Sequence, residues 1–371
     1  MSVKFIHTAD WQIGMKALSA GDAAKAVREA RIQAARNVVQ AAIENEASFI
    51  LHAGDIFEDN AVDRAQVRQI GEILAAFPRE VYLIPGNHDP LVPGSVWEHP
   101  VWQENANLHV CREAVPVERP DCVILPCPLK EKYSRCDPTA WIRSPEEGET
   151  RIRIGLAHGT IEGIPVEDDC FPVPRDAGLR SGLDYLALGH WHSTATYETG
   201  GTCRMAYSGT HETSKFGERD SGNCLVVEIA HHKAVPAIRS IRSGILQWLS
   251  IESEIHDSAG LAAARSQLDA VTLPSSHLVR LTLTGVLTTE AQPAVAALQE
   301  IMATRFLRGQ MDSTGLLPAP EDDSWIATIP LGPHREAASR LLDLSRKESD
   351  PAGRLVAARA LIELFKLNAS L

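Results

Sequence analysis

Three apolar segments near the start of the chain each lead to a polar residue, and a helix-like segment separates each from the next. The apolar segments are residues 3–7, 48–52 and 81–84, and the polar residues that follow them are Asp10, Asp55 and Asn87. Between them, residues 22–46 and 63–77 carry apolar side chains at helical spacing. Alternating strands and helices predict a parallel sheet, and open α/β sheets carry their sites at the carboxyl ends of the strands. We therefore expect these three polar side chains to meet at one sheet edge.

Histidines follow two later strand-like segments in the same way. His158 follows residues 151–156, and the pair His190 and His192 follows residues 184–188. A single Asp or His after a strand is usually a cap or a turn residue, but the whole set combines carboxylates, an amide and imidazoles. These are ligand types from which proteins build two-metal hydrolytic centres. The sequence therefore predicts a hydrolytic metal centre assembled from distant parts of the chain.

The segments after residue 100 predict strands with few helices. They are residues 107–110, 122–125, 151–156, 184–188, 203–207 and 224–229. Short strands bounded by turn residues such as 199–202 indicate a second sheet packed on the first. Residues 144–150 and 162–175 are expected to be surface loops, and the second loop is long enough to border a site. The fold class is thus α/β with two packed sheets.

From about residue 244 the order of elements changes. A small βαβα unit is expected from strand 246–251, helix 258–268, strand 278–283 and helix 290–303. A connection rich in glycine, proline and aspartate, at residues 312–320, leads to two terminal helices at 333–347 and 350–366. The predicted domains are residues 1–243, 244–320 and 321–371. The apolar series on the terminal helices predicts either a hairpin packed on its own chain or a surface for a partner.

Composition limits the classes of protein that remain. The formal net charge of -12 argues against a basic coat, so any binding to nucleic acid must be local, metal-assisted or shared with a partner. The seven cysteines are odd in number and include no C-x-x-C pair, which excludes an evident disulfide framework or structural zinc site. We find no signal-peptide pattern and no apolar run long enough to cross a bilayer, and therefore expect a cytoplasmic protein without a membrane partner.

Four short motifs resemble one known superfamily. They are His7–Trp11, Gly54–Phe57, Pro85–Asp89 and Leu188–His192. Together with the single His158 they resemble the calcineurin-like metallophosphoesterases and, more narrowly, the SbcD-type DNA repair nucleases with their YhaO-like branch. The similarity covers the chain to about residue 230, and the βαβα unit is similar to that family's capping domain. The resemblance implies a two-sheet αββα sandwich with a capping domain and C-terminal helices.

The resemblance also implies a role for each candidate residue. Asp55 would bridge two metals, with Asp10 and His192 on the first metal. The ligands of the second metal would be Asn87, His158 and His190. His88 would be the acid near the leaving oxygen, and Asp89 its orienting partner. Two divalent cations suit these donors, and we expect manganese, although zinc or iron could occupy the same ligands.

One position departs from the family pattern. The family places a histidine two residues after the first aspartate, where this chain has Gln12. An amide oxygen is a harder and weaker ligand than an imidazole for such metals. We therefore include Gln12 among the metal ligands and expect the first metal to bind less tightly.

The resulting functional hypothesis is a hydrolase, a metal-dependent nuclease acting on DNA in repair. It would act as a homodimer together with an SbcC-like coiled-coil ATPase. The C-terminal helices would hold the coiled coil of that ATPase. Exonuclease action fits the family, but the sequence leaves endonuclease action open. One alternative is a phosphodiesterase or phosphatase for small molecules such as cyclic nucleotides, because its metal centre would need the same ligands. Another is a DNA-binding or scaffolding subunit whose site is weakened at Gln12.

Overall fold

The computed structural model describes residues 2–164, 170–198, 200–288, 291–318 and 323–369. The expected loop 162–175, turn 199–202, helix 290–303 and connection 312–320 therefore each lie partly outside the described residues. The chain forms two compact units, Met1–Gln247 and Trp248–Leu371. None of the seven cysteines, all of which lie in the described ranges, forms a disulfide bond. Among the described residues, no helix has both the length and the apolar character needed to span a bilayer.

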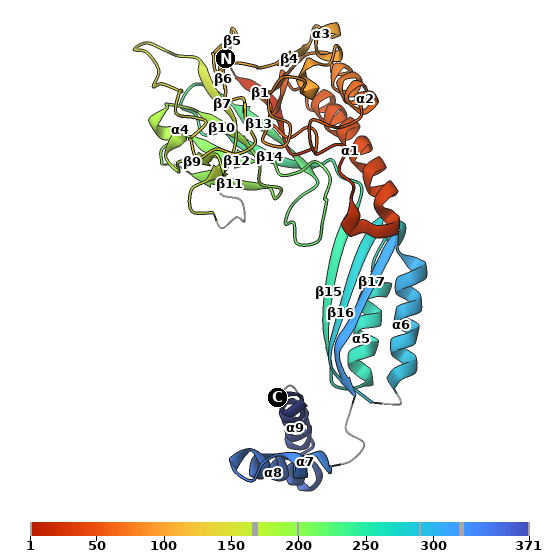
Figure 1. The fold of residues 1–371 in the computed structure, drawn as a ribbon. Helices are drawn as coiled ribbons and strands as arrows, with labels where there is room; N and C mark the ends of the chain where they lie inside the picture. The colour runs from red at the N-terminus through yellow and green to blue at the C-terminus, as the bar shows by residue number, and fades with distance from the viewer. Residues whose placement is uncertain (1, 165–169, 199, 289–290, 319–322, 370–371) are drawn as a thin grey trace. The chain divides into compact units, whose positions relative to one another are not determined.

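The first sheet of the N-terminal unit contains the three strands expected at the start of the chain (Figure 1). Its strand order is β14-β13-β1-β2-β3-β4. The strands are β1 (Val3–Thr8), β2 (Phe49–His52), β3 (Glu80–Leu83), β4 (Leu108–Val110), β13 (Asn223–Ile229) and β14 (Ala237–Arg242). Strands β1 to β4 run parallel, and β13 is antiparallel to both of its neighbours. The carboxyl ends of β1, β2 and β3 therefore lie side by side.

Helices cover the outer face of this sheet. The turn η1 (Leu18–Ala23) leads into α1 (Ala24–Glu44), and α2 (Arg64–Ala75) follows β2. Asp63 begins α2 because its carboxylate accepts a hydrogen bond from the backbone amide of Ala65 at 2.7 Å. Apolar side chains from both helices, including Val38 and Leu74, pack with Ile50 of the sheet. The short elements η2 (Val96–Glu98) and α3 (Val101–Glu104) complete this layer.

The second sheet has the order β11-β12-β10-β7-β6-β5. Its strands are β5 (Val117–Glu118), β6 (Cys122–Pro126), β7 (Ile152–His158), β10 (Tyr185–Gly189), β11 (Ala195–Glu198) and β12 (Arg204–Tyr207). Strands β6, β7, β10 and β12 run parallel, with an antiparallel strand at each edge. The small pair β8 (Thr160–Ile161) and β9 (Pro172–Val173) and the turn α4 (Ala177–Arg180) follow β7 and precede β10.

A buried core joins the two sheets. Phe5 and Phe49 stack at 5.1 Å between ring centroids, and the edge of Tyr185 from the second sheet meets Phe5 at 5.6 Å. A further apolar cluster, which includes Leu186 and Val173, lies on the other face of the second sheet. The unit is therefore the mixed α/β, two-sheet sandwich that the sequence predicts.

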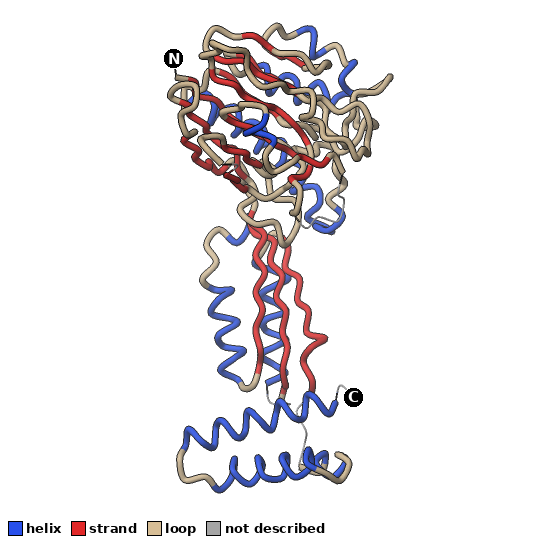
Figure 2. The backbone as a smooth tube through the Cα atoms, turned by 90° about the vertical axis from the view of Figure 1, so that its left-hand side faces the viewer, coloured by secondary structure: helices blue, strands red, loops and turns tan. Residues whose placement is uncertain are grey.

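The C-terminal unit begins with a three-stranded sheet in the order β15-β16-β17 (Figure 2). The strands are β15 (Gln247–Ile255), β16 (His277–Leu287) and β17 (Arg308–Pro318). The helices between them are α5 (Ser258–Asp269) and α6 (Gln292–Arg305), with the turn η3 (Pro274–Ser276) before β16. Leu261 and Leu268 of α5 and Leu298 of α6 pack on the sheet. The expected βαβα unit is present, with one more strand.

The extra strand β17 corrects the expected connection at residues 312–320. Its residues up to Pro318 pair in parallel with β16, with a register shift between Thr282 and Thr284. Its glycines mark close packing instead of turns, since a Cβ on Gly309 would meet the carbonyl oxygen of Met302 at 2.0 Å. A glycine-rich edge strand with a bulge thus has the composition of a loop.

Three helices end the chain: α7 (Trp325–Thr328), α8 (Pro333–Lys347) and α9 (Pro351–Ala369). They have a small core of their own, where Ile326, Ile329 and Ala338 are buried. Leu344, Leu355 and other apolar side chains remain exposed on α8 and α9. Part of the apolar series therefore packs within the hairpin and part faces outward.

Candidate metal centre

The two sheets bring the expected polar residues to neighbouring strand ends. Asp10, Asp55 and Asn87 follow β1, β2 and β3, while His158 ends β7 and His190 follows β10. The φ angles of Asp10, Asp55 and His190 are 55°, 56° and 105°. Residues other than glycine rarely adopt positive φ, and such strained positions cluster at functional sites. The chain therefore bends sharply where it presents these three side chains.

Asp10, Asp55 and His158 form the centre of the cluster. Each offers one ligand atom, and these atoms lie within 4.8 Å of one another. All three side chains are buried. In the part of the chain that the structure describes, no lysine or arginine forms an ion pair with either carboxylate, and the closest cationic partner is His158, 3.3 Å from Asp55. Two buried carboxylates thus lack a lysine or arginine counter-ion.

The ring of His158 has a fixed orientation. Its Nδ1 donates to the carbonyl oxygen of Ala53 at 2.8 Å, which leaves the lone pair of the neutral ring on Nε2. Nε2 lies 2.8 Å from Oδ1 of Asn87 and 3.3 Å from Oδ2 of Asp55. A lone pair directed at two acceptor oxygens is unfavourable, so this arrangement needs either a proton on Nε2 or a cation among these atoms.

Asn87 connects two imidazoles. Its Oδ1 also lies 3.0 Å from Nδ1 of His190. The backbone amide of His190 donates to both carboxylate oxygens of Asp10, at 2.9 and 3.1 Å. On the far side of the ring, Nε2 of His190 is 3.9 Å from the thiol of Cys170. Asp10, Asn87, His158 and His190 thus belong to one contact network.

His192 approaches the cluster through a residue that the sequence analysis missed. Its Nδ1 lies 2.9 Å from Oε1 of Glu218, whose side chain is only 3% exposed. The backbone amide of Thr210 donates to the carbonyl of His192 at 3.0 Å, and the Thr210 hydroxyl donates to the carbonyl of Asp10 at 2.8 Å. His192 therefore lies next to the Asp10 turn.

His88 and Asp89 do not form the expected pair. The carboxylate of Asp89 accepts the backbone amides of Gly86 at 2.8 Å and Phe57 at 3.0 Å. The ring of His88 instead contacts the carbonyl of Glu58, with Nδ1 at 2.9 Å. In this structure the Asp89 carboxylate therefore contacts the loop amides, and the His88 ring contacts the carbonyl of Glu58 instead of Asp89.

Gln12 lies in the turn that crosses the Asp55 loop. Its backbone amide donates to the carbonyl of Asp55 at 3.0 Å, and its φ is 40°. The residue is buried, with 7% of its surface exposed. The Gln12 backbone thus lies next to that of Asp55, the residue that would bridge the two metals according to the resemblance.

Glycines allow the loops to approach one another this closely. A Cβ on Gly86 would lie 2.1 Å from Oδ1 of Asp55, and one on Gly189 would lie 2.0 Å from the carbonyl of Ala53. Because no side chain fits in either place, glycine is required before Asn87 and before His190. The glycines of the motifs therefore have a packing role at the site.

A buried arginine supports the site from behind. Arg31 of α1 donates to the carbonyl of Trp11 from Nε at 2.9 Å and to that of Glu212 from Nη1 at 2.8 Å. Its Nη2 also reaches the carbonyl of Asp10 at 3.2 Å. A charged residue in the otherwise apolar series Val27, Ala34 and Val38 was the available sequence signal for it. No comparable signal marks Glu218.

Burial and the neighbouring charges shift the pKa values of Asp10, Asp55 and His158. Burial raises the pKa of Asp10. Burial acts in the same direction on Asp55, but the neighbouring His158 imidazolium outweighs it and lowers the pKa of Asp55. Burial lowers the pKa of His158, whereas the Asp55 charge and hydrogen bond together raise it to about 9. Without a cation from outside, the His158 imidazolium is the principal charge that balances Asp55.

The donor set fits divalent metal ions. Carboxylate, amide and imidazole donors converge without a lysine or arginine in ion-pair contact among the described residues, and the Nε2 atom of His158 faces oxygens that cannot donate to it. First-row divalent metals such as manganese, iron and zinc accept this mixture of ligands. The geometry therefore provides a candidate site for metal at Asp10, Asp55 and His158.

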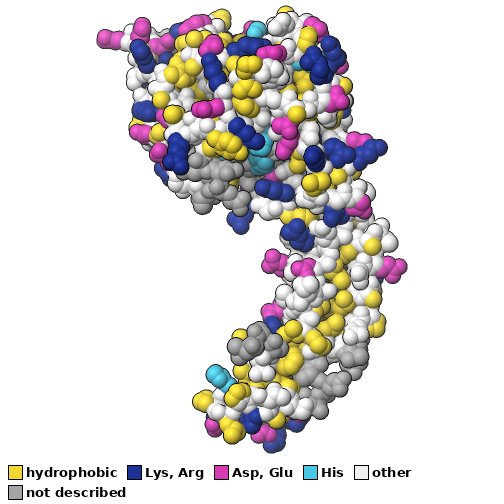
Figure 3. Space-filling model, viewed as in Figure 1, with side chains coloured by type: hydrophobic (Ala, Val, Ile, Leu, Met, Phe, Trp, Pro, Cys, Tyr) yellow, Lys and Arg dark blue, Asp and Glu magenta, His cyan; other side chains and the backbone are white. Residues whose placement is uncertain are grey.

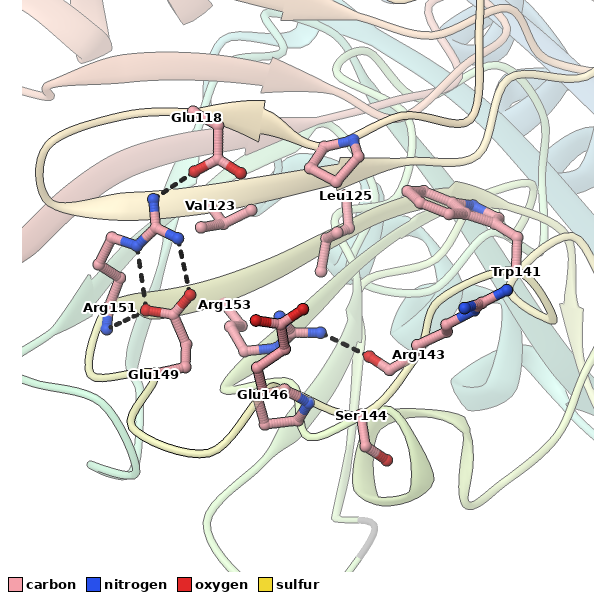
Figure 4. Close-up of a pocket in the computed structure, with 12 residues that line it drawn as sticks. Glu118, Val123, Leu125, Trp141, Arg143, Ser144, Glu146, Glu149, Arg151 and Arg153 are labelled. Carbon is pink, nitrogen blue, oxygen red and sulfur yellow. Dashed lines mark hydrogen bonds and ion pairs between the residues drawn. The ribbon is translucent and has the colours of Figure 1, made fainter.

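A separate pocket of about 400 Å³ lies over β5, β6 and β7 (Figure 4). Arg151 pairs there with Glu118 and Glu149, and Nη2 of Arg153 donates to the carbonyl of Arg143 at 2.7 Å. None of the expected site residues lines this pocket. Its charged groups mostly neutralise one another, so it resembles a packed surface hollow more than a second reactive site.

The fold and the cluster together define a metallophosphoesterase. Residues 3–194, just over half of the chain, match the family model described as calcineurin-like phosphoesterase. The chain belongs to this family, whose members hydrolyse phosphoesters with a dinuclear metal centre.

A bacterial relative shares part of the sequence. The uncharacterized metallophosphoesterase YhaO of Bacillus subtilis is 32% identical over 203 residues, which cover 51% of this chain and 48% of YhaO. The chain thus spans about half the length of this curated relative. Among solved structures, TT1561 of Thermus thermophilus has a TM-score of 0.42 at 10% identity, over 66% of this chain and 100% of that one. The phosphoesterase YfkN of Bacillus subtilis has a TM-score of 0.41 at 12% identity, over 65% and 91%.

Proposed function

We propose that the protein is a metal-dependent DNA nuclease of the SbcD type that acts in DNA repair. The convergence of acidic, amide and imidazole side chains at the strand ends of both sheets is the observation that carries the hydrolytic part of this proposal: Asp10, Asp55, Asn87, His158 and His190 meet there, and His192 lies next to the Asp10 turn. The narrower motif resemblance and the appended C-terminal unit support DNA as the substrate. On the face shown in Figure 3, basic and acidic side chains are interspersed, so phosphate binding would depend on the metals and on local contacts.

Two metals, manganese by preference, would share Asp55. Asp10, Gln12 and His192 would hold the first, and Asn87, His158 and His190 the second. When bound, such ions activate water and neutralise charge that builds on a phosphodiester during in-line displacement. The buried carboxylates would fix the ions, and the carbonyl of Ala53 would keep the His158 ring in its ligating orientation.

His88 would supply the proton for the leaving oxygen. Its Nδ1 contact with the carbonyl of Glu58 places a proton on Nδ1 and leaves Nε2 as the atom that can exchange a proton with substrate. Its backbone amide donates to Oδ1 of Asp55 at 2.9 Å, which keeps the ring next to the metal cluster. Asp89 would act on the loop backbone that carries His88, through the amides of Gly86 and Phe57.

The C-terminal helices would bind the coiled coil of an SbcC-like ATPase, and the nuclease would work as a homodimer. Exposed Leu344, Leu355 and Val356 on α8 and α9 support this assignment, since the hairpin already buries its own small core. A groove of about 450 Å³ runs between these helices, lined by Leu341, Val356 and other residues. Removing residues 331–371 should abolish ATPase binding while leaving hydrolysis intact; insolubility of that fragment would favour packing on its own chain.

The scaffold alternative rests on Gln12. If the amide weakens the first metal enough, the protein would bind DNA and its partner without cleaving. Degradation of end-labelled duplex DNA by chelator-treated protein, with and without added Mn²⁺, separates the two. The nuclease proposal predicts Mn²⁺-dependent cleavage that His88→Ala lowers about 10²- to 10⁴-fold, the usual contribution of a general acid. Cleavage equal in wild type and His88→Ala, or none at saturating Mn²⁺, would contradict it.

The same assay addresses small substrates. A phosphodiesterase for cyclic nucleotides would hydrolyse them faster than it degrades DNA under the same metal concentration. Comparing kcat/KM for a cyclic nucleotide and for a short DNA duplex therefore decides between these substrate classes. A preference for the cyclic nucleotide would replace the nuclease proposal.

A further inference from the structure

The three imidazoles of the cluster differ in what holds them. Nδ1 of His158 donates to a backbone carbonyl, at Ala53, and Nε2 of His190 lies against the thiol of Cys170. Nδ1 of His192 instead contacts a carboxylate, Oε1 of Glu218 at 2.9 Å. A carboxylate makes the imidazole that donates to it a stronger ligand, because it stabilises the positive charge that metal binding places on the ring.

Glu218 is itself held rigidly. The backbone amide of Ser214 donates to its Oε2 at 2.8 Å, and the Ser214 hydroxyl donates to its Oε1 at 2.6 Å. The surrounding loop is fastened to the His192 segment, because the amide of Arg219 donates to the Ser193 hydroxyl at 3.0 Å. A side chain that is 3% exposed and receives three hydrogen bonds has little freedom to move away from the ring.

The hydrogen bond also selects a tautomer. A carboxylate can only accept, so the proton of the neutral His192 ring must lie on Nδ1, and the lone pair must lie on Nε2. Thr210 joins the backbone of His192 to that of Asp10, which puts this ring beside the Asp10 turn. The lone pair is thus prepared on the ring atom that Glu218 does not occupy.

We propose that Glu218 is a positioning residue of the metal centre: by holding Nδ1–H of His192, it directs the Nε2 lone pair to a metal on the Asp10 side and strengthens that bond. This inference rests on the metal centre of the proposed function, but not on DNA as the substrate. His192 would thereby offer the metal on the Asp10 side a strong donor, whereas Gln12 would offer the same metal a weak one. Glu218 touches neither substrate nor metal.

Glu212 offers a matched control on the same loop. It is also a buried glutamate, but its carboxylate accepts the backbone amides of Ile245 at 2.6 Å and Thr213 at 3.1 Å instead of an imidazole. Glu212→Gln therefore tests the effect of a buried charge on the loop without altering a histidine.

The experiment measures metal binding by the full-length, chelator-treated protein. Titration calorimetry with Mn²⁺ gives the affinity and number of sites, and the visible spectrum of the Co²⁺ form reports ligand geometry. Glu218→Ala should weaken one of the two metal equivalents roughly 10- to 100-fold, as loss of an outer partner of a ligand does, and should change the Co²⁺ spectrum. Glu218→Gln retains an acceptor oxygen and should show a smaller weakening in the same direction, while Glu212→Gln should match wild type.

Wild-type Mn²⁺ affinity and an unchanged Co²⁺ spectrum in folded Glu218→Ala would overturn the inference. If Glu218→Ala does not fold, the same two readouts in Glu218→Gln decide, and unchanged values there would overturn it as well. If the wild type binds Mn²⁺, and the Glu218 variants bind it more weakly, but the wild type does not cleave DNA, the nuclease proposal alone would be refuted. Wild-type protein that binds no Mn²⁺ would refute both.

Discussion

Each of the two units contains a cluster of two carboxylates and one imidazole, and their surroundings differ. In the N-terminal unit, Asp10, Asp55 and His158 are buried. In the C-terminal unit, Glu254 and Glu363 are exposed and His256 is half-buried.

Among the described residues, a lysine forms ion pairs with only one of these clusters. The ammonium of Lys366 lies 2.6 Å from Glu254 and 3.0 Å from Glu363, so the exposed cluster is neutralised by its own chain and by solvent. The buried cluster has no such lysine or arginine among the described residues. Composition alone therefore does not distinguish the two clusters as candidate metal sites. Burial without a lysine or arginine counter-ion favours the Asp10 cluster.

The largest effect is expected from a substitution in the buried cluster, at Asp55. Asp55→Asn removes a buried carboxylate whose ligand atom lies within 4.8 Å of those of Asp10 and His158. Metal content should therefore fall below two equivalents, and phosphodiester hydrolysis should drop by at least about 10³-fold, because a bound metal contributes several kcal/mol to the transition state. Metal analysis and initial rates at saturating Mn²⁺ check this. Asp312→Asn, on the exposed strand β17, serves as the control. Undiminished hydrolysis in Asp55→Asn would contradict a role for the buried cluster in metal binding and hydrolysis.

The second effect is a pH dependence of the buried cluster. Burial lowers the pKa of His158, but its contacts with Asp55 raise it to about 9 in the metal-free fold, above the usual value near 6.5. The associated stability is fully present below about pH 6.5 and is lost as pH rises through about 9. The free energy of unfolding of metal-free protein should thus fall by roughly 3 kcal/mol across this window. Urea denaturation at several pH values measures it, and His158→Asn should lack the slope.

The same titration controls metal affinity. A cation must displace the proton from His158, so Mn²⁺ affinity should rise about tenfold per pH unit up to about pH 9 for each proton released. At limiting Mn²⁺, hydrolysis should therefore weaken as the pH falls. A rate that is flat from pH 9 to pH 5 at limiting metal would argue against His158 as a ligand.

Much of this site could be predicted from the sequence, because its donors follow strands in chain order. Placement of Asp10, Asp55 and Asn87 at adjacent strand ends required only the alternation of strands and helices. Contacts made by residues in irregular loops gave no such periodic signal. Glu218 reaches His192 across 26 positions, and Glu58 replaces Asp89 as the contact of His88 through a backbone carbonyl that any residue type would offer.

The fold shows the same limit on what can be predicted from the sequence. Helices α1 and α2 and the central strands have apolar periodicity, whereas β17 contains Gly309, Gly315 and Asp312 and has the composition of a connection. Its pairing depends on close backbone approach to β16 and α6, and such approach leaves no apolar periodicity in the sequence. Local sequence patterns therefore predict the elements that pack through apolar side chains. They miss a strand such as β17, where glycines without side chains allow the backbones to approach closely.

A smaller effect is expected at the one position that departs from the family pattern. Gln12→His restores an imidazole next to Asp10 and should tighten the weaker metal about tenfold or more, the lower end of what one altered interaction at a metal site changes. Equilibrium dialysis at low Mn²⁺ measures the occupancy, with Gln40→His on the exposed face of α1 as the control. Equal two-metal occupancy in wild type and Gln12→His would show that Gln12 does not weaken the site.

The smallest effect belongs to the exposed cluster. Lys366→Ala should lower stability by less than about 1 kcal/mol, because solvent screens exposed ion pairs, and added salt should reduce the difference further. It should not change the Mn²⁺ content of the protein. A new tightly bound Mn²⁺ in Lys366→Ala would mean that exposure does not distinguish the clusters.

Anomalous diffraction from crystals soaked in Mn²⁺ tests the central claim most directly. We expect two peaks among Asp10, Asp55, Asn87 and the imidazoles of His158, His190 and His192, about 3.5–4 Å apart as in other two-metal sites, and no peak beside Lys366. Manganese at Glu254 and Glu363 with none at Asp55 would contradict it.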